Sequence, residues 1–105
     1  MFRYPIAGLA LLASLAGPAN AAAAEAPPGA SSCSGCHAAS AEVQTPVPRL
    51  VGRPAVDIVT AMEAFRLGQR PGTVMDRIAK GFSESEIAAI AAWYAAQERV
   101  RLRQR

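Results

Sequence analysis

The stretch Cys33-Ser34-Gly35-Cys36-His37 contains both cysteines and the only histidine of the 105-residue chain. Cys-x-x-Cys-His is the attachment pattern of a c-type haem. Two intervening residues let both thiols reach the two vinyl groups of one porphyrin from a single turn of backbone. The histidine that follows is then held below the iron, where an imidazole nitrogen can bind it. The stretch therefore predicts one covalent haem c, attached through Cys33 and Cys36, with His37 as the proximal iron ligand.

Three other uses of the two cysteines are open from the residues alone. A thioredoxin-like redox pair expects a βαβ setting, which the sequence does not show. A zinc site needs about four ligands, and the chain has no second pair of cysteines or histidines. A structural disulfide would close so short a loop that it would stabilise the fold little. Covalent haem is the preferred interpretation.

The first residues predict an export signal. Residues 1–4 form a short basic start, and residues 6–15 are apolar and uncharged. Ala19-Asn20-Ala21 is a small-x-small cleavage site, with Ala21-Ala22-Ala23 as an adjacent alternative. The apolar run is shorter than the ~20 residues of a membrane span, so no transmembrane segment is expected after cleavage. We predict a cleaved signal peptide, a flexible lead-in and one cytochrome c domain over residues 1–21, 22–29 and 30–105.

Size and charge restrict the possible functions. The chain has 11 basic and 8 acidic residues, with few aromatic side chains that could stack on bases, so no nucleic-acid partner is expected. The 84 residues that follow residue 21 can bury only a small core. A porphyrin bonded at several points would stabilise such a core. We therefore predict that the haem-free chain is largely unfolded.

The patterns predict an all-α fold with no strands. Pro54 is suited to the first turn of a helix, and Gly68 ends that helix. Ser83 and Glu86 form a capping box at the start of the last helix, whose tail is expected to fray. Its apolar stripe consists of Ile87, Ile90, Ala91 and Tyr94. The four expected helices cover residues 30–37, 55–67, 74–80 and 84–100.

Methionine is the expected second iron ligand, because a thioether is a soft ligand that favours Fe(II). After residue 21, methionine occurs only as Met62 and Met75. Met62 lies on the apolar face of a predicted helix, where it is expected to fill the core. Met75 follows a Pro-Gly turn, in a segment free to arch over a flat cofactor. We predict Met75 as the distal ligand; five-coordinate iron is the alternative.

Pro48-Arg49-Leu50-Val51-Gly52 is expected to form the other wall of the site. The carbonyl of Pro48 can accept the second N–H of His37, which would fix the tautomer and raise the basicity of the ligand. An ordinary extended loop is the alternative.

Together these motifs resemble the small class I cytochromes c. The resemblance implies about four helices around one covalent haem, with the first and last helices crossing. It also implies haem attachment at Cys33 and Cys36, iron ligation by His37 and Met75, and a carbonyl contact from Pro48. The segment before Cys33 is shorter and richer in proline than a long first helix allows, which puts the crossing in doubt.

Residues 62–70 and 73–83 more narrowly resemble the cytochrome subunit of flavocytochrome c sulfide dehydrogenase. In that family an FAD-bearing subunit oxidises sulfide, and the cytochrome subunit takes the electrons through its haem. The resemblance implies a periplasmic one-electron carrier, because c-type haem is attached outside the cytoplasm in bacteria. Its implied partners are an FAD-containing dehydrogenase subunit and other redox proteins.

The chain is not expected to be an enzyme by itself. It has no Ser/His/Asp set, since its one histidine is used for iron. The rival functions are a stand-alone cytochrome c serving a respiratory oxidase, a haem-based ligand sensor with an open sixth position, and a small module without haem. The basic residues 99–105 are interpreted as a solvated helix end; contact with an acidic partner or a membrane surface is the alternative.

Overall fold

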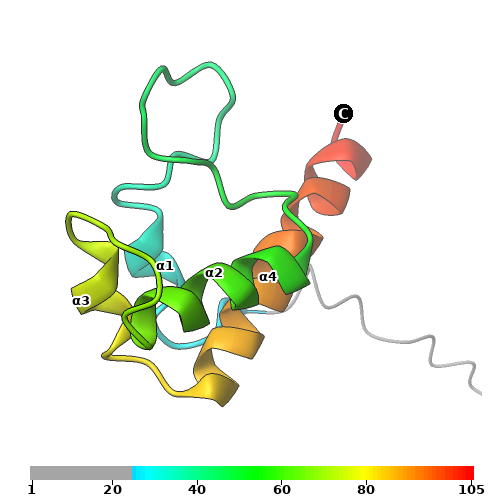
Figure 1. Ribbon diagram of the computed structural model, residues 1–105. Coiled ribbons are helices and arrows are strands. Elements are labelled where there is room, and N and C mark those ends of the chain that lie inside the picture. The colour runs from blue at the N-terminus through cyan, green and yellow to red at the C-terminus, as the bar shows by residue number, and fades with distance from the viewer. Residues whose placement is uncertain (1–24) are drawn as a thin grey trace, which may run out of the picture.

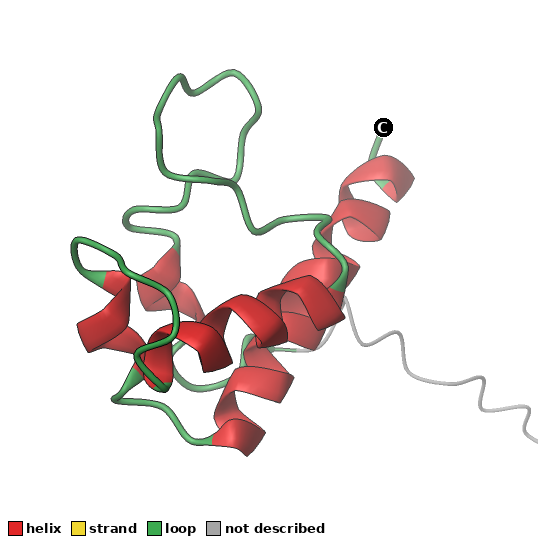
Figure 2. Cartoon of the chain, in the orientation of Figure 1, coloured by secondary structure: helices red, strands yellow, loops and turns green. Residues whose placement is uncertain are grey.

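The structure is a computed structural model that describes residues 25–105. No strand occurs in this range (Figure 2), so the predicted all-α fold is confirmed. None of the described helices combines the length and the apolar character that a membrane span requires. The predicted signal peptide, residues 1–21, and the first part of the lead-in lie outside the described residues. The four helices are α1 (Ala30–Cys33), α2 (Ala55–Arg66), α3 (Met75–Ala79) and α4 (Glu84–Arg103).

Helix α2 is central to the arrangement and contacts both α3 and α4 (Figure 1). It begins after Pro54, whose φ of −55° suits a helix start and whose carbonyl accepts the amide of Asp57. It ends before Gly68, which has a φ of 71°, a left-handed conformation that glycine adopts without steric cost. Both predicted boundaries of this helix therefore hold to within one residue.

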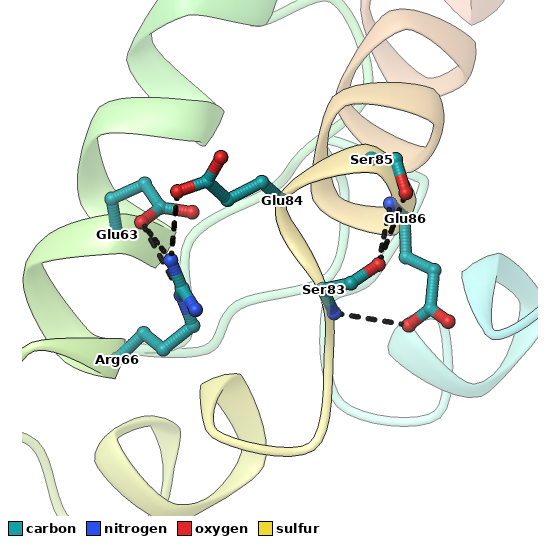
Figure 3. A network of polar contacts seen from close by, with 6 residues as sticks. All are labelled: Glu63, Arg66, Ser83, Glu84, Ser85 and Glu86. Carbon is teal, nitrogen blue, oxygen red and sulfur yellow. Dashed lines mark hydrogen bonds and ion pairs between the residues drawn. The ribbon is translucent and has the colours of Figure 1, made fainter.

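Helix α4 begins with the predicted capping box (Figure 3). The Ser83 hydroxyl accepts the amide of Glu86 at 3.2 Å, and the Glu86 carboxylate accepts the amide of Ser83 at 3.2 Å. The other end differs from the prediction, because the helix continues past Val100 to Arg103. The residues there are good helix formers, and their positive charges are favourable near the negative end of the helix.

Replacing Ser83 with alanine is expected to lower the free energy of unfolding by about 1 kcal/mol, because an amide in the first turn of α4 loses its acceptor. For a domain of this size, that loss lowers the melting temperature by roughly 4–8 °C. Thermal unfolding of the haem-loaded protein measures it. The matched control is Ser85→Ala, whose hydroxyl contacts the Ser83 hydroxyl at 3.1 Å and caps no amide; equal losses in both variants would contradict the assignment.

A surface ion-pair network joins the end of α2 to the start of α4 (Figure 3). The guanidinium of Arg66 lies 2.8 Å from the Glu63 carboxylate and 3.2 Å from that of Glu84. The hydrogen bond to Glu63 is the main reason why the pKa of Arg66 is raised. The network therefore joins α2 and α4 at the surface, beside the packing of their apolar faces.

The core is small and lies mainly between α2 and α4. The predicted stripe on α4 is buried, which confirms it, but Ile87 is the one large side chain among the described residues that is fully enclosed. Several large apolar side chains stay exposed, namely Val43, Val56, Leu67, Val74, Ile78 and Leu102. The described polypeptide thus leaves much of its apolar surface uncovered by its own packing.

Helix α1 is shorter than predicted, since it ends at Cys33 instead of His37. Beyond it the chain tightens into turns, in which the amides of Gly35 and Cys36 donate to carbonyls three residues back. Serine and glycine at positions 34 and 35 favour this ending. α1 has only one turn of helix, and it packs against α4 through Ala30, so the first and last helices of the described chain are in contact.

Candidate functional site

The two cysteines lie at the end of α1 and in the turn that follows. Cys33 is half-buried and packs against the core, whereas Cys36 is exposed, and neither is in a disulfide. The Cys33 thiol donates to the carbonyl of Gly29 at 3.6 Å. Both thiols are therefore free to react with a group that the chain itself does not supply.

The two thiols differ in their surroundings. Burial raises the pKa of the Cys33 thiol above its ordinary value of 9.0, and this effect outweighs the opposing influence of its own backbone amide and of the nearby Tyr94 side chain. The Cys33 thiol therefore stays protonated at neutral pH.

The single histidine is held by the loop that leads to α2. Its Nδ1 lies 2.5 Å from the carbonyl oxygen of Pro48, which is the contact expected from the sequence. A carbonyl can only accept a hydrogen bond, so Nδ1 carries the proton. In the neutral ring, Nε2 then keeps a free lone pair and is the nitrogen of His37 that can bind a metal ion.

The loop that holds His37 is itself fastened to α4. The Gly52 amide donates to the carbonyl of Tyr94 at 3.2 Å. Gly52 has a φ of 81°, and a Cβ there would lie 3.2 Å from the Cβ of Glu98. Both the conformation and the close approach to α4 thus favour glycine. The neighbouring Val51 is buried, so the loop is fixed at this end.

The two methionines occupy different environments. Met62 lies on α2 and packs against the core cluster, as predicted. Met75 is the first residue of α3, is half-buried, and lies next to Val74 and near Ile78. Those two neighbours are 54% and 45% exposed. The Met75 sulfur is therefore in a segment whose apolar side chains are still uncovered, whereas Met62 packs against the core.

The alternative uses of the cysteines fit the structure less well. Within residues 25–105, no three His, Cys, Asp or Glu side chains come together as a metal site, whereas zinc needs about four ligands. The same range has no strand, so a thioredoxin-like setting is absent there. Two free thiols, an imidazole with Nε2 available, a thioether outside the core and uncovered apolar surface fit haem c.

Two contacts to the motif region were not predicted. The Tyr94 hydroxyl donates to the Ala30 carbonyl at 2.5 Å, across 64 residues. The guanidinium of Arg101 donates to the Ala39 carbonyl at 3.1 Å, across 62 residues. For Tyr94, the sequence indicated only that a tyrosine lies in the buried stripe. A buried hydroxyl needs a hydrogen-bond partner, but the pattern did not identify that partner. Nothing in the pattern indicated the contact of Arg101.

Comparison with known proteins gives three relatives. The cytochrome subunit of sulfide dehydrogenase from Chlorobaculum tepidum is 38% identical over 63 residues, 60% of this chain and 57% of that protein. Cytochrome c-554(548) from Halomonas halodenitrificans is 37% identical over 70 residues, 63% of this chain and 84% of that protein. The thiosulfate dehydrogenase electron acceptor from Thiomonas intermedia is 34% identical over 91 residues, 85% of this chain and 42% of that protein.

The extent of these matches differs. The chain spans about half the length of the Chlorobaculum and Thiomonas proteins. It spans most of the Halomonas protein. No protein-family model matches the chain.

Proposed function

The chain belongs to the c-type cytochromes, and from this membership we propose that it accepts single electrons from an FAD-bearing sulfide dehydrogenase subunit. The Chlorobaculum relative, named as such a cytochrome subunit, supports this partner. The structural observation that carries the haem assignment is the contact between His37 Nδ1 and the Pro48 carbonyl, beside two free thiols. It gives an imidazole the orientation that an iron ligand needs.

The roles of the site residues follow from their chemistry. Haem c, when bound, supplies an iron that alternates between Fe(III) and Fe(II) and so carries one electron. Cys33 and Cys36 would hold the porphyrin through thioether bonds, and His37 would bind iron through Nε2. The Pro48 carbonyl keeps the imidazole oriented and makes Nε2 a stronger donor. Met75 would supply the soft sulfur ligand.

None of these residues forms or breaks a bond in a substrate. We therefore assign any catalysis to the partner subunit and electron acceptance to this chain. We place the mature protein in the periplasm, with the signal peptide removed near Ala21. Residues 30–105 would then form the haem domain.

Purification of the protein from its native host tests the proposal. We expect one covalent haem per chain in a pyridine haemochrome assay, and a co-eluting subunit that contains flavin. Sulfide should reduce the haem in this complex, whereas the isolated haem chain should not react with sulfide. A chain without tetrapyrrole mass would overturn the haem assignment, and a haem chain that elutes without flavin would overturn the partner.

A free electron carrier is the second candidate. The match to most of cytochrome c-554(548), and the match to a thiosulfate dehydrogenase electron acceptor, support it. In that case the haem chain elutes alone, and it is reduced by a separate dehydrogenase that it meets transiently. Gel filtration of the native extract, followed by flavin and haem absorbance, separates the two candidates.

A further inference from the structure

Helix α4 contacts the chain on both sides of the motif (residues 33–37). Before the motif, the Tyr94 hydroxyl donates to the Ala30 carbonyl at 2.5 Å. After it, the guanidinium of Arg101 donates to the Ala39 carbonyl at 3.1 Å. Tyr94 and Arg101 are seven residues apart, about two helical turns, so their side chains leave α4 on the same side.

Both side chains are held by further contacts. Tyr94 is 3% exposed, and its ring meets that of Trp93 edge to face, with the centroids 4.9 Å apart. Arg101 also pairs with the Glu98 carboxylate, one turn earlier, at 3.7 Å. These contacts restrict the rotamers of the two donors and therefore reduce the entropy that each hydrogen bond costs.

The space between the two contacts is not filled by packing. A cavity of about 230 Å³ lies there, lined by Ser31, Ser34 and Ala39 on the motif side and by Trp93 and Gln97 on α4. Side chains that do not interdigitate contribute little dispersion attraction. Ala30 and Cys33 still pack against the core, and the two hydrogen bonds add to this packing in attaching residues 30–39 to α4.

Tyr94 also reaches the histidine indirectly. Its carbonyl accepts the amide of Gly52 at 3.2 Å, and the Pro48 carbonyl in the same loop holds His37. One residue of α4 thus supports the segment before the motif through its side chain, and the loop behind the imidazole through its backbone.

We propose that Tyr94 and Arg101 are positioning residues, which clasp residues 30–39 from α4 and hold the motif in the arrangement that the haem requires. The inference rests on the proposed haem function. It assigns a structural task to Arg101, within the C-terminal stretch that was interpreted as a solvated helix end.

Amide hydrogen exchange of the haem-loaded protein tests the clasp, because exchange reports local opening. Arg101→Gln replaces the guanidinium with a shorter side chain and so breaks the contact with the Ala39 carbonyl. It should speed exchange about fivefold at the hydrogen-bonded amides of Cys36 and His37, as expected for one hydrogen bond of ordinary strength. Tyr94→Phe leaves the Ala30 carbonyl without its donor, and should speed exchange about tenfold at residues 30–34. The rest of α4 should change much less.

Two variants separate positioning from general stability. Arg99→Gln removes the same charge from an exposed position of the same helix, and should leave exchange at the amides of Cys36 and His37 unchanged. Arg101→Lys keeps a long donor and should restore most of the protection. The clasp is overturned if Arg101→Gln matches Arg99→Gln, if lysine does not rescue, or if exchange rises equally along the whole chain.

The haem content of each sample, measured beforehand, separates this test from that of the proposed function. If the unmodified protein contains no haem, the proposed function is wrong, and so is the positioning role of Tyr94 and Arg101 that rests on it. If all samples contain full haem but Arg101→Gln and Tyr94→Phe leave local exchange unchanged, only the positioning role is wrong.

Discussion

A variant in which Cys33 and Cys36 are both serine is expected to lose the cooperative thermal transition of the haem-loaded protein. We expect its circular dichroism to show little helix at 25 °C and no sharp unfolding step on heating. Serine matches the size of the cysteine that it replaces, so the main effect of the change is to remove the attachment of haem. The comparison is made with the purified haem-loaded protein in the same buffer.

The size of this effect follows from the core. Nine hydrophobic residues are buried in the described part of the chain, and four of them are alanines. Side chains that small contribute little apolar surface, so the driving force for folding is low. Val74 and Ile78 remain about half exposed. A porphyrin that covered such side chains would supply the apolar burial that the chain lacks.

Ser34→Ala is the matched control for the double serine variant. Its hydroxyl donates to the Ser31 carbonyl at 2.6 Å on the exposed side of the turn, and the change preserves both cysteines and the histidine. We expect full haem attachment and a melting temperature within a few degrees of the original. A cooperative transition in the haem-free chain, close to that of the haem-loaded protein, would contradict the role given to the cofactor.

Local signals in the sequence were sufficient for much of the helical structure. Ser83 and Glu86 satisfy each other's backbone amides whatever the rest of the chain does, so the start of α4 could be predicted from four residues. The same holds for Gly68, whose left-handed φ ends α2. The spacing within the motif is also local, and it was enough to indicate the chemistry of the site.

The long-range contacts that position the motif could not be predicted from local sequence patterns. Periodicity identified the buried face of α4, but it does not say which carbonyl a buried tyrosine meets, and that of Ala30 lies 64 residues away. The contact of Arg101 with Ala39 depends on where the loop after the motif runs. A run of arginines indicates only charge, so the extension of α4 to Arg103 and its attachment to that loop needed the three-dimensional arrangement.

Replacing Met75 with alanine is expected to open the sixth coordination position of the iron. The reduced variant should bind CO essentially to completion, whereas the unmodified protein should be indifferent to it. The oxidised variant should lose the weak long-wavelength absorption band expected of methionine sulfur on Fe(III). Its reduction potential should fall, because the thioether that stabilises Fe(II) is gone.

Met62→Ala is the matched control, since it removes the same side chain from the core. Met62 packs against the buried cluster between α2 and α4, so we expect a loss of about 2 kcal/mol in the free energy of unfolding. The absorption band and the indifference to CO should remain. The two variants thus separate a ligand, whose loss changes the spectrum, from a core residue, whose loss changes stability.

The opposite result would make Met62 the iron ligand and Met75 the structural residue. If Met62→Ala opened the iron to CO while Met75→Ala kept the band, α2 would supply the ligand, although its methionine packs against the core. If the unmodified protein already bound CO, the sixth position would be open, and a ligand sensor would replace the electron carrier as the best reading of the site. A closed site that opens with Met75→Ala supports electron transfer, because an iron with both axial positions filled by protein changes its surroundings little when it is reduced.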